Sequence, residues 1–152
     1  MPERIFTENG TQYLIKVVFL EKALTEFTKE GSLNETQRGD ILFFTYDVTS
    51  EESFENTKNV FKFVQRGNDS AVMYLVGNFT DKGNRVISVE TGKETVSSCT
   101  DGYFREVSAK EGTGISELLD EAIHHFLISK TEKIVMKKQA LSVVKKKGCV
   151  LL

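Results

Sequence analysis

The sequence predicts an α/β fold in which helices cover both faces of a doubly wound, mostly parallel sheet. Continuous apolar runs at residues 41–46 and 71–76 are typical of strands that are buried on both faces. Each run is followed by a segment whose apolar residues recur at helical spacing. Strands that alternate with helices form βαβ units, so these strands are expected to lie parallel in one sheet.

The chain is expected to open with an antiparallel pair of strands. Residues 4–7 and 12–20 flank Asn9-Gly10, a dipeptide that favours a tight hairpin turn. Residues 21–38 are polar and irregular, and we expect a loop with a short helix there.

Two helices are predicted between the apolar strands and the C-terminal part of the chain. The first covers residues 51–67 with Ser50 as its N-terminal cap, and the second covers residues 89–99 with Ser88 as its cap. The remaining elements are a strand that contains Phe104 and a helix from about Ile115.

The length of 152 residues suits one domain, which we place at residues 1–132, followed by a flexible basic tail at residues 133–152. A net charge of -2 favours no nucleic-acid partner. Two cysteines, Cys99 and Cys149, do not make a disulfide framework, and this is typical of a reducing compartment.

Distinctive residues follow three of the expected strands. They are Tyr-Asp-Val-Thr-Ser-Glu-Glu-Ser-Phe at 46–54, Val-Gly-Asn-Phe-Thr-Asp at 76–81 and Glu-Val-Ser-Ala-Lys at 106–110. Each motif alone is weak evidence for a family, since Asn and Asp are ordinary turn residues. In this order and at this spacing they resemble the second half of Ras-superfamily small GTPases, most closely the Rab branch. The resemblance runs from about residue 4 to 130 and implies a G-domain that lacks its first strand, phosphate-binding loop and first helix.

The resemblance also implies a site for the guanine base. A carboxylate such as Asp81 can accept two guanine N–H groups in charge-assisted hydrogen bonds. The family places the Asn78 amide near the purine edge, the Ala109 N–H toward O6 and the Lys110 stem on the ring. The implied nucleotide-binding residues are Asn78, Asp81, Ser108, Ala109 and Lys110.

Three departures from the family pattern weaken the expected activity. No Gly-x-x-x-x-Gly-Lys-Ser/Thr run is found in the 152 residues, so the phosphates and Mg²⁺ lose their expected ligands. Residues 21–26 stand where Rab-like proteins have Asp-Thr-Ala-Gly-Gln-Glu, with Thr25 in place of the glutamine that orients water. Phe79 replaces the lysine of the Asn-Lys-x-Asp motif: it could stack on a base but carries no ammonium group.

From these departures we expect weak or lost binding of GTP and GDP, and Mg²⁺ only together with nucleotide. No residue is assigned a catalytic or metal-binding role, and whether the chain hydrolyses GTP stays open.

The last four residues fit a C-a-a-X prenylation box, with Cys149 as acceptor and a final Leu typical of a geranylgeranyl group. A lipid and a lysine-rich segment together supply the two signals that stable anchoring needs. This predicts a location on the cytoplasmic face of membranes. The other interpretation is a chance cysteine beside a solvated lysine run.

The predicted function is therefore a Rab- or Ras-like guanine-nucleotide switch in membrane trafficking or signalling, which binds effector or regulator proteins. Two alternatives remain. One is a prenylated, nucleotide-independent interaction module that is tethered to a membrane. The other is a truncated product of a full-length GTPase.

Overall fold

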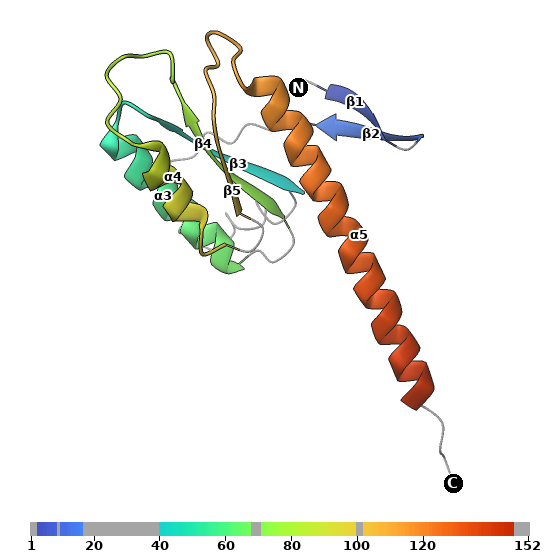
Figure 1. The fold of residues 1–152 in the computed structure, drawn as a ribbon. Helices are drawn as coiled ribbons and strands as arrows, with labels where there is room; N and C mark the ends of the chain where they lie inside the picture. Colours follow the sequence, from blue (N-terminus) through green and yellow to red (C-terminus); the bar gives the residue numbers. More distant parts are fainter. Residues whose placement is uncertain (1–2, 9, 17–39, 68–70, 100–101, 148–152) are drawn as a thin grey trace.

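A three-stranded parallel sheet lies at the centre of the computed structural model, which describes residues 3–8, 10–16, 40–67, 71–99 and 102–147 (Figure 1). Its strands are β3 (Ile41–Asp47), β4 (Val72–Asn78) and β5 (Gly102–Glu106), in the order β3-β4-β5. The middle strand pairs with both neighbours in parallel, with Leu75 opposite Phe44 on one side and Phe104 on the other.

Helices cover both faces of this sheet. Helices α3 (Glu51–Gly67) and α4 (Val89–Val96) lie on one face, and α5 (Ile115–Lys147) lies on the other (Figure 1). Side chains alternate along β4, so Met73 and Leu75 join the core under α3 and α4, whereas Val72, Tyr74 and Val76 join the core under α5. The predicted α/β fold is confirmed.

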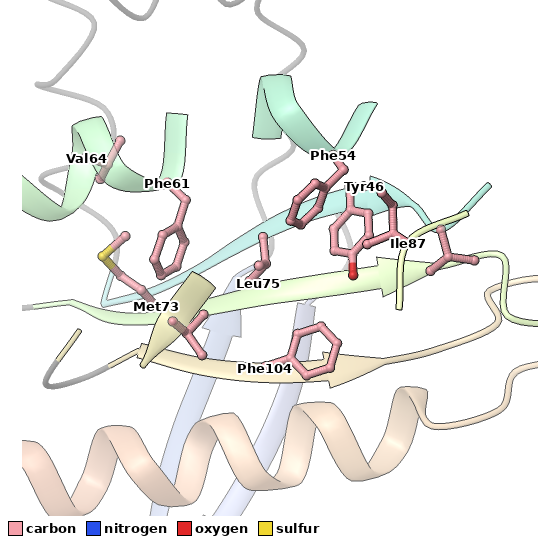
Figure 2. Close-up of a cluster of buried hydrophobic side chains, with 10 residues drawn as sticks. Tyr46, Phe54, Phe61, Val64, Met73, Leu75, Ile87 and Phe104 are labelled. Carbon is pink, nitrogen blue, oxygen red and sulfur yellow. The ribbon is translucent and has the colours of Figure 1, made fainter. Parts of the chain in front are cut away.

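Aromatic rings fill much of the core beneath α3 (Figure 2). Phe61 meets Phe44 edge to face with 5.3 Å between ring centroids, and Tyr46 meets Phe54 in the same way at 5.0 Å. Edge-to-face contacts bring the positive edge of one ring to the negative face of the other. They attach α3 to the middle and the carboxyl-terminal end of β3.

On the opposite face of the sheet, a polar contact attaches α5 to β4. The hydroxyl of Tyr74 lies 2.7 Å from Nδ1 of His125, whose ring stacks on Tyr103 with 3.8 Å between centroids. Desolvation by burial is the main reason that the pKa of His125 lies below its ordinary value. The lowered pKa favours the neutral imidazole at neutral pH, and the Glu121 carboxylate, 3.9 Å from Nδ1, acts in the opposite direction.

The helix starts agree with the predicted caps. Ser50 Oγ accepts the Ser53 N–H at 3.2 Å, and Ser88 Oγ accepts the Thr91 N–H at 3.1 Å. The predicted end of α4 near residue 99 is too late, because the helix ends at Val96. The Ser97 hydroxyl donates to the Glu94 carbonyl oxygen at 2.8 Å, and such local side-chain bonds compete with continuation of a helix.

The predicted N-terminal hairpin is confirmed. Strands β1 (Glu3–Glu8) and β2 (Thr11–Lys16) pair antiparallel as a separate sheet, with Glu8 opposite Thr11. Gly10 has a φ of 76° in the connecting turn, a conformation that glycine adopts without steric cost. The rest of the predicted second strand and the predicted loop at residues 21–38, with the altered segment 21–26, lie outside the described residues.

The structure differs from the prediction at the basic tail, because α5 continues through residues 133–147. Lysine is a good helix former, and neither glycine nor proline occurs between Gly114 and Gly148. Among the described residues, no helix is long and apolar enough to cross a membrane.

Candidate guanine-recognition site

The ends of β4 and β5 bring all five predicted site residues into two adjacent loops. Asn78 is the last residue of β4, Asp81 lies in the loop that follows, and residues 108–110 follow β5. The loops are joined through their backbones, because the Thr80 N–H donates to the Val107 carbonyl oxygen at 3.4 Å. Ligands of open α/β sheets bind outside the carboxyl ends of the strands, which is where these residues lie.

The Asn78 side chain bridges the two loops. Its Oδ1 atom accepts the N–H of Phe79 at 2.7 Å and the N–H of Ala109 at 3.0 Å. The family resemblance assigns that Ala109 N–H to guanine O6, and in this structure it is donated to Asn78. The two loops are therefore held in register by an internal hydrogen bond.

Asp81 is held as an ionised carboxylate against the second loop. Ser108, which is buried, donates from Oγ to Asp81 Oδ1 at 2.7 Å, and the Lys110 ammonium lies 3.8 Å from Oδ2. The hydrogen bond from Ser108 is the largest cause that lowers the pKa of Asp81, and attraction to Lys110 acts in the same direction. Asp81 is therefore a charged acceptor at neutral pH, as recognition of guanine N–H groups requires.

The same contacts determine how Asp81 responds to pH. Because its pKa is lower in the folded chain than in the unfolded chain, these contacts stabilise the fold above the ordinary pKa of aspartate. That contribution is lost as the pH falls through the lowered pKa. Only 7% of the Asp81 side chain is exposed, so the carboxylate is oriented by the protein and little by solvent.

Two further contacts fix the shape of the second loop. The Ser108 N–H donates to the Thr113 carbonyl oxygen at 3.0 Å, which closes the loop between β5 and α5. At the end of β5, Glu106 accepts two hydrogen bonds from the Arg85 guanidinium, at 2.7 and 2.8 Å. Sequence reasoning missed Arg85, because no local pattern reveals an ion pair between residues so far apart.

The end of β3 contributes a charged residue that sequence reasoning also missed. Asp47 Oδ1 accepts the N–H and the hydroxyl of Thr49, and these bonds are the main reason that the pKa of Asp47 is lowered. Asp47 Oδ2 lies 3.2 Å from the ammonium group of Lys82. The Asp-x-Thr spacing is a signal for such a turn, whereas nothing in the sequence indicates the pairing with Lys82.

The structure brings Asp81, Asn78 and the amide of Ala109 together at this edge of the sheet, with the Ala109 N–H donated to Asn78 Oδ1. Within the part of the chain that the structure describes, no three His, Cys, Asp or Glu side chains are grouped to hold a metal ion.

Comparison with known proteins shows the family to which the chain is similar. Residues 26–128 match a family model described as Ras family. The chain is 33% identical over 109 residues to the Ras-related protein RabC of Dictyostelium discoideum, covering 68% of this chain and 55% of that protein. It is 40% identical over 78 residues to the Ras-related protein SEC4 of Candida albicans, covering 50% of this chain and 37% of that protein.

A further relative is human Ras-related protein Rab-30, 31% identical over 80 residues, which cover 52% of this chain and 39% of that protein. The chain thus spans about half or less of the length of these curated relatives. The family match begins at Glu26, so the resemblance of residues 4–25 stays a prediction.

Proposed function

Because the chain belongs to the Ras family and is a Rab-like small GTPase relative, we propose that it recognises guanine nucleotides through the loops after β4 and β5. The family as a whole binds GTP and GDP with Mg²⁺, and these are the ligands we propose here. We further propose that the protein acts as a switch in membrane trafficking or signalling, with effector or regulator proteins as partners.

One observation carries the proposal, namely the ionised Asp81 carboxylate held by Ser108 and Lys110. A charged acceptor of this kind favours guanine, whose N1–H and exocyclic amine both donate, over adenine. Asn78 and Ala109 lie in the same two loops, 3.0 Å apart from Oδ1 to N. These contacts support recognition of the base rather than of the phosphates.

For the 152-residue chain we propose weak binding of the phosphates and very slow hydrolysis. The sequence contains no Gly-x-x-x-x-Gly-Lys-Ser/Thr run, whose backbone amides and lysine would cradle the phosphates. Binding energy should therefore come mainly from the base, and Mg²⁺ should associate only when a nucleotide is present.

The test is a titration of the chain with guanosine, adenosine and GDP plus Mg²⁺, followed by NMR chemical shifts and calorimetry. We expect guanosine to bind in preference to adenosine, and GDP to bind little more tightly than guanosine. Replacing Asp81 with asparagine should weaken guanosine binding about tenfold or more, because a charge-assisted hydrogen bond is lost. Asp40→Asn, at an exposed position before β3, is the matched control and should change nothing.

Equal affinity for adenosine, or no binding of guanosine at millimolar concentration, would contradict the proposal. A second candidate would then remain, a membrane-tethered interaction module that works without nucleotide. One observation favours it: Asn78 and Ala109 are bonded to each other, and Asp81 to Ser108, so the site is already satisfied internally.

We also propose a lipid anchor at Cys149, supported by the C-a-a-X pattern and the upstream lysines. Mass spectrometry of protein from eukaryotic cells should show a geranylgeranyl group on Cys149. Leu152→Ser should change the lipid to farnesyl, because the last residue selects the prenyl group. An unmodified Cys149 in protein that fractionates with the cytosol would overturn the anchor, and Cys149→Ser is the negative control.

A further inference from the structure

Phe79 occupies a backbone conformation that side chains rarely adopt. Its φ is 67°, and among the described residues it is the one non-glycine residue with a positive φ. Two hydrogen bonds hold it there, from its N–H to Asn78 Oδ1 at 2.7 Å and from the Lys82 N–H to its carbonyl oxygen at 3.0 Å. Strained residues of this kind persist where the surrounding contacts determine them, and they concentrate at functional sites.

A cation covers one face of the Phe79 ring. The ammonium group of Lys82 lies 3.9 Å from the ring centroid, well within the range of a cation–π contact. The same ammonium is 3.2 Å from Asp47 Oδ2, so it is anchored to the end of β3. Asp47 is itself fixed through Oδ1, which accepts both the N–H and the hydroxyl of Thr49.

The ring remains accessible despite this contact. Phe79 is 38% exposed, so part of its ring faces solvent. It lies two residues before Asp81 and next to Asn78. Hydrogen bonds to a base lie in the plane of the base, whereas stacking acts on its face, so one short loop presents both kinds of contact.

We propose that Phe79 is a stacking platform for the purine base and that Lys82, held by Asp47, is the residue that positions the ring. The ring supplies a flat apolar surface, and Lys82 supplies a positive charge against it. This inference rests on the proposed recognition of guanine and names how the face of the base is bound. The ligand class is guanine nucleosides and nucleotides, with the base as the part recognised.

The test uses guanosine as the probe, because it carries the base without phosphates. Phe79→Leu keeps an apolar side chain and removes the ring, and it should weaken guanosine binding about 5- to 100-fold, the range for loss of one base–aromatic stack. In the native chain the guanosine H8 proton should shift upfield on binding because of the ring current. That shift should disappear in Phe79→Leu.

Lys82 is tested by two substitutions and one control. Lys82→Met keeps the length of the stem but removes the cation, and it should weaken binding about 2- to 5-fold and reduce the upfield shift of H8. Lys82→Arg should restore both, since arginine also stacks on aromatic faces. Lys130→Met removes a lysine that lies over Phe126 on α5, a contact of the same type away from the loops, and should change neither readout.

The outcomes separate this inference from the proposed function. If Phe79→Leu binds guanosine with native affinity and an unchanged H8 shift, while Asp81→Asn still weakens binding, the stacking inference alone is overturned. If Lys82→Met leaves both readouts unchanged, the positioning role of Lys82 is overturned. If the native chain binds no guanosine, the proposed function fails and the inference fails with it.

Discussion

Replacing Phe61 with alanine is expected to lower the free energy of unfolding by about 3–5 kcal/mol. Phe61 is fully buried on α3 and packs edge to face against Phe44 of β3 (Figure 2). Removing the ring loses its transfer free energy and leaves a cavity that neighbouring side chains fill only in part. Since domains are typically stable by about 5–15 kcal/mol, this single change would remove a large share of the total.

Urea denaturation followed by circular dichroism measures the change, and Lys62→Ala is the matched control. Lys62 is the next residue on the same helix and is exposed, so its substitution should shift stability by less than about 0.5 kcal/mol. A small effect at Phe61 would mean that α3 does not pack on the sheet as described.

Replacing Gly114 with alanine is expected to destabilise the fold by about 2–4 kcal/mol and to displace the Ser108 loop. Gly114 has a φ of 76°, and a Cβ atom there would lie 2.9 Å from the Glu106 backbone oxygen. The clash is with the backbone of β5 rather than with a flexible side chain, so relief requires the loop or the start of α5 to move. Such a movement would shift Ser108 away from Asp81.

Gly112 provides the control, because its φ is 73° and a Cβ atom there would meet no atom within 4 Å. Gly112→Ala should therefore cost only the strain of the left-handed conformation, about 1–2 kcal/mol. Amide chemical shifts of Ser108 and Ala109 should move in Gly114→Ala and stay near their native values in Gly112→Ala. Equal effects of the two substitutions would show that close approach to Glu106 has no energetic importance.

Much of the fold could be predicted, because the apolar runs of the strands and the caps of the helices are local in the sequence. The apolar runs at residues 41–46 and 71–76 indicated two strands, and Ser50 and Ser88 marked the starts of two helices. The prediction of burial on both faces holds for β4 but is wrong for β3, where Phe43 and Thr45 are exposed because β3 lies at the edge of the described sheet. The continuation of α5 could not be predicted from composition, since a lysine-rich segment suits both a solvated coil and a helix.

The residues of the candidate site that directly follow a strand could be predicted from the sequence. Asn78, Asp81 and the residues 108–110 follow strand ends in a fixed order, so their meeting follows from a parallel sheet. The contact of Lys82 with both Phe79 and Asp47 depends on where a long flexible side chain points. No spacing rule encodes that direction, so Lys82 was missed.

Because residues 128–147 are helical, the distance that they span is nearly fixed, whereas a disordered segment would span a variable distance. The helix leaves the core after Phe126, and these residues span about 30 Å at 1.5 Å per residue (Figure 1). A disordered chain would let the domain lie flat against a bilayer. If Cys149 carries the proposed lipid, the helix instead holds the domain away from the bilayer, and the loops proposed to bind guanine remain accessible to partners that approach from the aqueous side.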